Sequence, residues 1–125
     1  MSTYVMADIH GEIDRYHAML DLINFSADDQ LYIIGDIIDR GSEGLTILQE
    51  IMDKGNVHFI LGNHEDMMLG TLSQHSYPGA RTMWKQNGGD KTYRELLYHM
   101  KSADRERILA YCRTRPAMET VEVGE

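Results

Sequence analysis

The sequence predicts an α/β fold with a mostly parallel sheet that begins as β-α-β-α-β. Three short apolar segments, residues 4–7, 31–34 and 57–61, are each followed by a loop rich in polar residues. Two longer segments between them, residues 12–23 and 45–54, carry apolar residues at helical spacing. Strands that alternate with helices in this way are typical of stacked β-α-β units with right-handed crossovers.

Each element of this start has its own local signal. The first helix is amphipathic, because its apolar residues recur at intervals of three and four: Ile13, Tyr16, Leu20 and Ile23. The strand at 31–34 contains only Leu, Tyr and Ile, so we expect it to be buried. The second helix is expected to end near Lys54, with Gly55 as a left-handed cap. Asn63 is a suitable cap for a third helix, with Asp66 three residues later.

The second half of the chain is less regular. Residues 73–88, which include Pro78, are expected to form a loop. Residues 89–100 and 103–113 are expected to form two further helices, the second capped by Ser102. An alternating segment, Thr120–Val123, looks like the start of a strand. We therefore expect one domain, residues 1–125, that is cut short at its C-terminus.

Composition excludes several classes of protein. The formal net charge of -8 argues against non-specific nucleic-acid binding, which requires clustered Lys and Arg. The apolar segments are too short to cross a bilayer, so no membrane association is expected. Cys112 is the single cysteine and cannot form an internal disulfide. A cytoplasmic location is expected on these grounds; the sequence does not indicate an oligomeric state.

Three polar clusters directly follow the three predicted strands. They are Asp8-Ile9-His10-Gly11, Gly35-Asp36-Ile37-Ile38-Asp39-Arg40-Gly41 and Gly62-Asn63-His64-Glu65. Asp8 and Asp36 are 28 residues apart, and Asp36 and Asn63 are 27 residues apart, so each gap fits one crossover. The clusters should therefore meet at the C-terminal edge of the sheet, where open α/β sheets bind ligands. Their carboxylate, imidazole and amide groups are suitable ligands for divalent metal ions.

These residue types suit the hydrolysis of phosphate esters. Two cations about 3.5–4 Å apart offset the charge of a phosphoryl group and acidify a bridging water. An imidazole can protonate the leaving group, and a guanidinium can bind two phosphate oxygens at once.

The three clusters, in this order and spacing, resemble the motifs of the calcineurin-like metallophosphoesterases. The arginine in Gly-Asp-x-x-Asp-Arg-Gly resembles the phosphoprotein phosphatase branch. A further block, Trp84-Lys85-Gln86-Asn87-Gly88-Gly89, resembles the bacterial and phage-lambda type of that branch. The resemblance implies the N-terminal part of a β-sandwich flanked by helices, with the second sheet largely missing here and an apolar sheet face exposed.

The resemblance also implies a role for each motif residue. Two divalent ions would be bound, with Mn²⁺ favoured over Fe and Zn²⁺. The implied ligands are Asp8, His10, Asp36 and Asn63. Of these, Asp36 would bridge the two ions. His64 would donate a proton to the leaving group, and Asp39 would orient His64. Arg40, together with Asn63, would bind the substrate phosphate.

The resemblance implies an enzyme that hydrolyses phosphoserine and phosphothreonine by direct attack of metal-bound hydroxide. Its partner would be a phosphorylated protein or a small phosphoester. A dinucleoside polyphosphate hydrolase is an alternative, because it shares all three motifs. A second alternative is a catalytically incomplete module that binds metal or a partner, because the family's later histidine ligands are absent.

Other residues have simpler interpretations. Glu65 is expected to be a first-turn helix charge or to support the ligands rather than to bind metal. Met67, Met68 and Trp84 are expected to fill the core. The remaining histidines are expected to be surface or structural residues: His17, His58, His75 and His99.

Overall fold

The three predicted strands form one parallel sheet. A computed structural model describes residues 1–73 and 76–122 of the chain. The strands lie in chain order: β1 (Thr3–Ala7), β2 (Gln30–Ile34) and β3 (Val57–Ile60). The crossovers contain α1 (Ile13–Leu22) and α2 (Gly44–Ile51). The predicted α/β class, parallel sheet and β-α-β-α-β start are confirmed.

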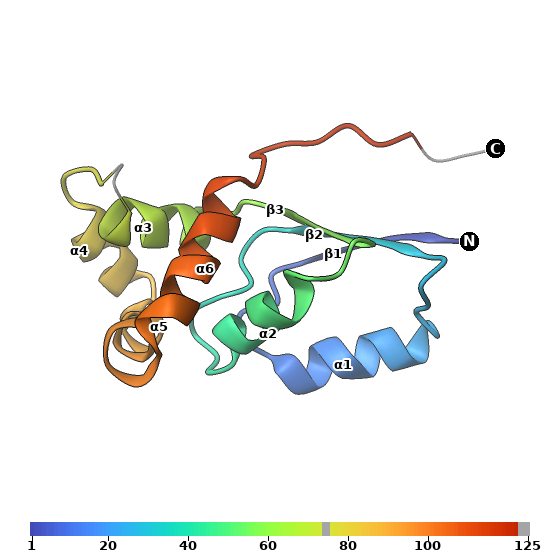
Figure 1. The fold of residues 1–125 in the computed structure, drawn as a ribbon, viewed down its shortest axis with the longest axis horizontal. Coiled ribbons are helices and arrows are strands. Elements are labelled where there is room, and N and C mark those ends of the chain that lie inside the picture. Colours follow the sequence, from blue (N-terminus) through green and yellow to red (C-terminus); the bar gives the residue numbers. More distant parts are fainter. Residues whose placement is uncertain (74–75, 123–125) are drawn as a thin grey trace.

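Among the described residues, helices cover one face of this sheet. Figure 1 shows α1 and α2 on the same side of the strands. On β2, Leu31 and Ile33 point to this side and are completely buried, whereas Ile34 points away and is 49% exposed. On β1, Val5 is 65% exposed. The expectation of a buried second strand is therefore confirmed for Leu31 and Ile33 but wrong for Ile34, while the expected exposed apolar face is present.

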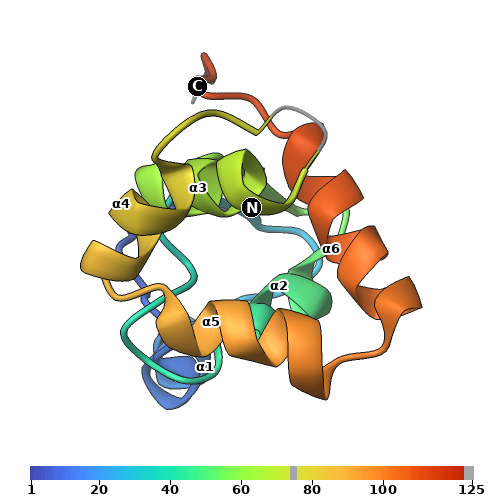
Figure 2. The same cartoon turned by 90° about the vertical axis from the view of Figure 1, so that its left-hand side faces the viewer.

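The remaining helices lie mostly beyond the C-terminal ends of the strands. They are α3 (Asn63–Leu72), α4 (Ala80–Gln86), α5 (Asp90–Arg94), the π-helical turn η1 (Glu95–His99) and α6 (Ser102–Arg113). Figure 2, which views the molecule from this end, shows α3, α4, α5 and α6 arranged around the strand ends. These helices therefore surround the edge at which the three polar clusters arrive.

The core joins the covered sheet face to these helices. Its completely buried side chains include Leu31, Ile33, Ile37, Ile38, Ile47, Leu48, Met68, Trp84, Leu96 and Ile108. After α6, the chain returns to the sheet, and the carbonyl oxygen of Pro116 accepts the N–H of Leu61 at 2.8 Å. No helix in the described part of the chain is long and apolar enough to cross a membrane.

The predicted loop at residues 73–88 is wrong, because it contains α4. This helix of seven residues follows Gly79, whose φ of 84° is in the left-handed region. Its apolar residues Ala80 and Trp84 are one helical turn apart, and both are buried. So short a helix gains its stability from packing against α3 rather than from local periodicity.

Several predicted helix ends also differ from the structure. The N-cap of α3 is Gly62 rather than Asn63, and the α6 N-cap is Lys101 rather than Ser102. The second helix ends at Ile51, and Gly55 does not have a positive φ. The final expected strand is not formed at residues 120–122, and Val123 lies outside the described residues.

Candidate functional site

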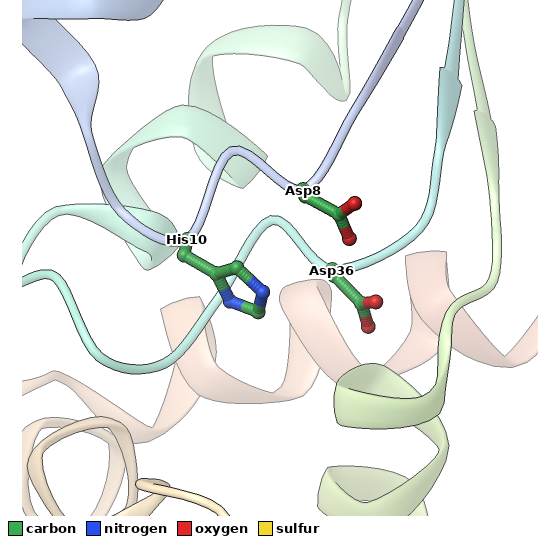
Figure 3. Close-up of side chains that lie close together, drawn as sticks. All are labelled: Asp8, His10 and Asp36. Carbon is green, nitrogen blue, oxygen red and sulfur yellow. The ribbon is translucent and has the colours of Figure 1, made fainter.

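The first two polar clusters bring three possible metal ligands together. Asp8 directly follows β1, and Asp36 follows β2 after one glycine. One ligand atom from each of Asp8, His10 and Asp36 lies within 4.8 Å of the other two. Figure 3 shows the three side chains projecting into the same space at the end of the sheet. Asp8 is exposed and the other two are half-buried, so an ion from solution can reach them.

Backbone hydrogen bonds hold these two loops against each other. His10 donates its N–H to the carbonyl oxygen of Asp36 at 3.0 Å, and Gly11 donates to Ile37 at 2.7 Å. In return, Gly41 donates to the carbonyl oxygen of His10 at 2.9 Å. A Cβ atom on Gly41 would lie 2.2 Å from that carbonyl oxygen. Glycine is therefore required here, because any side chain would force the two loops apart.

The site loops hold an unusual backbone conformation. In these two loops, five non-glycine residues have a positive φ: Asp8 (54°), His10 (46°), Asp36 (58°), Asp39 (76°) and Arg40 (69°). This left-handed region costs an ordinary residue roughly 1–2 kcal/mol. All five are predicted site residues, and the conformation persists because the surrounding hydrogen bonds impose it.

The hydrogen bond made by His10 leaves one of its ring nitrogens free. Its Nδ1 lies 3.0 Å from the carbonyl oxygen of Ile38, an acceptor, so Nδ1 carries the proton. The Nε2 lone pair then remains available for a metal ion. With the carboxylates of Asp8 and Asp36, the cluster offers one nitrogen and two anionic oxygen ligands. This set fits a divalent ion such as Mn²⁺, Fe²⁺ or Zn²⁺.

The third cluster reaches the same place through α3. His64 donates its backbone N–H to Oδ1 of Asp36 at 3.1 Å. A Cβ on Gly62 would lie 2.6 Å from that same oxygen. Asn63, which lies between these two residues, is exposed at the first position of α3. Asn63 therefore lies beside Asp36. Its roles as a metal ligand and as a phosphate-binding residue stay predictions.

The His64 side chain forms a buried pair with Asp39. Its Nδ1 lies 2.6 Å from Oδ2 of Asp39, and both residues are buried. The His64 ring also meets the His10 ring nearly at right angles, with the centroids 4.8 Å apart. The imidazole that we predict as proton donor thus lies beside the candidate metal cluster, and its Nδ1 is occupied by Asp39.

Arg40 is exposed at the end of the second cluster. Its backbone N–H is directed at the carbonyl oxygen of Gly88 at 3.4 Å. Within residues 1–73 and 76–122, no carboxylate forms an ion pair with its guanidinium. The side chain therefore remains available for an anion from solution.

Glu65 has a role that the sequence only partly indicates. It is completely buried, and its two carboxylate oxygens accept four backbone N–H groups. Oε1 accepts from Asp36 at 2.8 Å and Gly62 at 3.1 Å, and Oε2 from Ile37 at 2.8 Å and Ile38 at 3.2 Å. Burial raises the pKa of Glu65, whereas the N–H groups act in the opposite direction by favouring the carboxylate. Glu65 therefore shapes the loop that presents Asp36 and Asp39.

The sequence predicts Trp84 only as a core residue, but the indole also contacts the site. Its indole N–H donates to Oδ2 of Asp39 at 2.7 Å, across 45 residues of sequence. The only sequence signal for such a contact is that a buried indole N–H requires an acceptor.

The other histidines that the structure describes do not join the cluster. His17 lies 2.9 Å from Glu50, on α2. His58 lies 2.6 Å from the amide oxygen of Gln30 and stacks on Tyr32. His99 ends η1, and His75 lies outside the described residues.

A family comparison agrees with this geometry. The family described as calcineurin-like phosphoesterase matches residues 1–112. A symmetrical bis(5'-nucleosyl)-tetraphosphatase of Erwinia tasmaniensis is 31% identical over 124 residues, 98% of this chain and 41% of that protein. The protein of the same name from Haemophilus ducreyi is 40% identical over 74 residues, 58% of this chain and 27% of that protein. The chain thus spans less than half the length of either relative.

Solved structures show the same fold. A metallophosphoesterase from Sphaerobacter thermophilus covers 91% of this chain with a TM-score of 0.57 and 17% identity, and the match spans 41% of that chain. A protein serine/threonine phosphatase from Saccharomyces cerevisiae covers 93% with a TM-score of 0.56 and 16% identity, spanning 36% of that chain. At these identities the likeness concerns the fold alone.

The comparisons correct the expected specificity. The sequence motifs led us to expect a phosphoserine and phosphothreonine phosphatase of the phosphoprotein phosphatase branch. That expectation is wrong, because the curated relatives are named symmetrical bis(5'-nucleosyl)-tetraphosphatases. The motifs are shared by both kinds of enzyme, so they do not separate a phosphoprotein from a dinucleotide.

Proposed function

Since this chain belongs to the calcineurin-like phosphoesterase family, we propose that it carries the catalytic start of a dinucleoside polyphosphate hydrolase. The observation that supports phosphoester chemistry most directly is the cluster of Asp8, His10 and Asp36, with ligand atoms within 4.8 Å of one another. The names of the relatives support the substrate class. In this proposal, one water molecule hydrolyses the central phosphoanhydride bond of diadenosine tetraphosphate, which gives two molecules of ADP.

Members of this family bind divalent metal ions, and we propose Mn²⁺ for this chain. When bound, such ions supply Lewis-acid chemistry that offsets the negative charge of the phosphate chain. Asp8 and His10 would hold one ion, Asp36 would be shared, and Asn63 would contribute to the second position. The Nδ1 bond of His10 to the carbonyl oxygen of Ile38 would fix the ring for this purpose.

The protein groups around the cluster divide the remaining tasks. Arg40 would bind phosphate oxygens, because its exposed guanidinium can form two parallel hydrogen bonds to one phosphoryl group. His64 would hold a proton on Nε2 and donate it to the leaving oxygen. Asp39 would keep the ring in the required orientation through its 2.6 Å contact with Nδ1.

Product analysis with Mn²⁺ tests the substrate class. We expect the chain to convert diadenosine tetraphosphate to ADP and to release much less phosphate from a phosphoserine peptide. His64→Asn should lower turnover by roughly 10²–10⁴-fold, the usual range for a proton donor, without lowering the amount of bound Mn²⁺. A preference for the phosphopeptide, or cleavage to AMP and ATP, would contradict the proposed substrate and products.

The described ligands also support a catalytically incomplete module as a second candidate, because one complete three-ligand cluster is present within residues 1–73 and 76–122. Calorimetric titration with Mn²⁺ separates the two candidates. Two bound ions per chain together with ADP formation support the hydrolase. One bound ion with no turnover of any phosphoester supports the module.

A further inference from the structure

The indole of Trp84 shares an acceptor with the proposed proton donor. The Oδ2 atom of Asp39 lies 2.7 Å from Nε1 of Trp84 and 2.6 Å from Nδ1 of His64. Asp39 and Trp84 are completely buried, and His64 is 6% exposed. Two N–H donors from different helices, α4 and α3, therefore converge on one oxygen of one buried carboxylate.

These two bonds provide the side-chain anchoring of Asp39. Its other oxygen, Oδ1, is buried and has no hydrogen-bond partner in the part of the chain that the structure describes. A buried carboxylate needs donors to offset its lost hydration. Trp84 therefore supplies one of the two hydrogen bonds that orient the carboxylate toward His64. A phenylalanine would occupy the same core position with a smaller ring and would supply no donor.

The backbone around the indole fixes the position of this donor. A Cβ on Gly89 would lie 2.3 Å from Nε1 of Trp84, so the backbone at Gly89 lies directly against the ring. The Trp84 ring also meets the Tyr93 ring edge to face, with the centroids 6.0 Å apart. Since these two contacts confine the ring, its N–H stays directed at Asp39.

The same segment contacts the neighbouring substrate-binding residue. The carbonyl oxygen of Gly88 faces the backbone N–H of Arg40 at 3.4 Å. A Cβ on Gly88 would lie 3.2 Å from Cγ of Arg40. Residues 84–89 thus contact two consecutive residues of the second cluster, Asp39 through a side chain and Arg40 through the backbone.

We propose that Trp84 is a positioning residue, whose indole N–H holds Asp39 so that Asp39 fixes the His64 ring beside the metal cluster. This proposal rests on the proposed function for its consequence in catalysis, although its geometry does not. Loss of the indole N–H should loosen His64 without changing the metal ligands. It should therefore lower turnover and leave Mn²⁺ binding unchanged.

The indole resonance tests the geometry without any turnover. Trp84 is the only tryptophan, so the ¹H–¹⁵N NMR spectrum contains a single indole N–H signal. Asp39→Asn should move that signal upfield, because the amide is a weaker acceptor than the carboxylate. The matched control Asp21→Asn, at an exposed position on α1, should leave the signal in place. An unchanged signal in Asp39→Asn would overturn the proposal.

Trp84→Phe tests the effect on His64. In this variant, the Nδ1–H proton of His64 should exchange with water at least about 10-fold faster. Turnover should fall by about 10-fold to 100-fold, which is the range for groups that orient catalytic or metal-binding residues. Met68→Leu, at another completely buried position, controls for repacking and should change neither value beyond about 2-fold. If Trp84→Phe behaves like Met68→Leu in both measurements, the indole has only a packing role.

The two sets of results separate the proposals. If the parent chain cleaves no dinucleotide but Trp84→Phe still accelerates Nδ1–H exchange, the proposed function fails and the positioning role stands. If the parent chain cleaves the dinucleotide and Trp84→Phe keeps both slow exchange and full turnover, the proposed function stands and the positioning role fails.

Discussion

Oε1 of Glu65 accepts the backbone N–H of Asp36 at 2.8 Å, so the third polar cluster holds the second in place. Three further backbone N–H groups bind the same carboxylate. Glu65 is thus a connection between α3 and the loop after β2. The candidate metal ligand Asp36 depends on it for its backbone position.

Replacement of Glu65 should destabilise the fold strongly. Glu65→Ala leaves four backbone N–H groups without their acceptor, and each buried unsatisfied group costs about 1–3 kcal/mol. Partial access of water limits the expected loss to roughly 3–5 kcal/mol in the free energy of unfolding, measured in urea. Glu65→Gln should also destabilise the fold, because its NH₂ group would face two backbone N–H donors.

The control is Glu106→Ala, whose side chain is 63% exposed and whose replacement should change stability by less than about 0.5 kcal/mol. Equal effects at both positions would contradict this role.

Gly41→Ala should separate the first two clusters. Its Cβ would lie 2.2 Å from the carbonyl oxygen of His10, and this backbone atom cannot rotate away. We expect a loss of about 1–3 kcal/mol in unfolding free energy, as for other overpacked sites, and weaker Mn²⁺ binding. Gly55→Ala is the matched control, since its Cβ meets no atom within 4 Å. Calorimetric titration measures the Mn²⁺ affinity of both variants, and urea unfolding measures their stability. An unaltered Mn²⁺ affinity in Gly41→Ala would refute the prediction that the two clusters separate.

Asp8→Asn should have opposite effects with and without metal. The Asp8 and Asp36 carboxylates lie in one cluster within 4.8 Å, and they repel each other when no cation lies between them. The variant should therefore melt at a higher temperature than the parent in EDTA. Its Mn²⁺ affinity should be at least about 10-fold lower, because a neutral amide replaces an anionic ligand. The control Asp21→Asn should show neither change. If Asp8→Asn binds Mn²⁺ as tightly as the parent, Asp8 is not a metal ligand.

Tyr16→Phe should increase stability, and more so in alkali. The Tyr16 hydroxyl is buried and has no hydrogen-bond partner among the described residues, so its removal at pH 7 should gain up to about 1 kcal/mol. Burial, followed by the charge of Glu50, raises the pKa of Tyr16 from 10.0 to about 12. Between these values the unfolded chain releases the proton while the folded chain keeps it. The folded state therefore loses up to about 1.4 kcal/mol per pH unit as the pH rises.

Urea unfolding at pH 7, 10 and 11 measures this effect. The stability difference between Tyr16→Phe and the parent should widen above pH 10. Tyr98→Phe, which alters a side chain that is 71% exposed, should give a constant difference. A constant difference for Tyr16→Phe as well would show that the phenol titrates normally in the folded chain.

The parts of the fold that depend on local periodicity could be predicted from the sequence. The three strands and the first two helices have apolar residues at regular spacing, and polar clusters mark the strand ends. The convergence of Asp8, His10 and Asp36 followed from parallel topology alone. By contrast, α4 has too few turns to show a period, and the exposure of Ile34 depends on helices covering only one sheet face.

The supporting contacts of the site could not be predicted in the same way. Trp84 meets Asp39 across 45 residues, and Glu65 meets Ile37 across 28 residues. Such pairs are set by how α3 and α4 pack, which no local pattern encodes. The substrate class could not be predicted for another reason: the motif residues suit a phosphoryl group, which phosphoproteins and dinucleoside polyphosphates share, so the sequence left both as candidates.

The five left-handed residues around the cluster have a consequence for directed evolution. Glycine adopts a positive φ without the steric penalty of a Cβ, so Asp8→Gly relieves backbone strain at an exposed position. A library screened only for heat resistance will therefore enrich glycine at Asp8, and it will discard a carboxylate that we assign to metal binding. Thermostabilisation of this chain must hold all five side chains constant and draw its gains from other parts of the molecule.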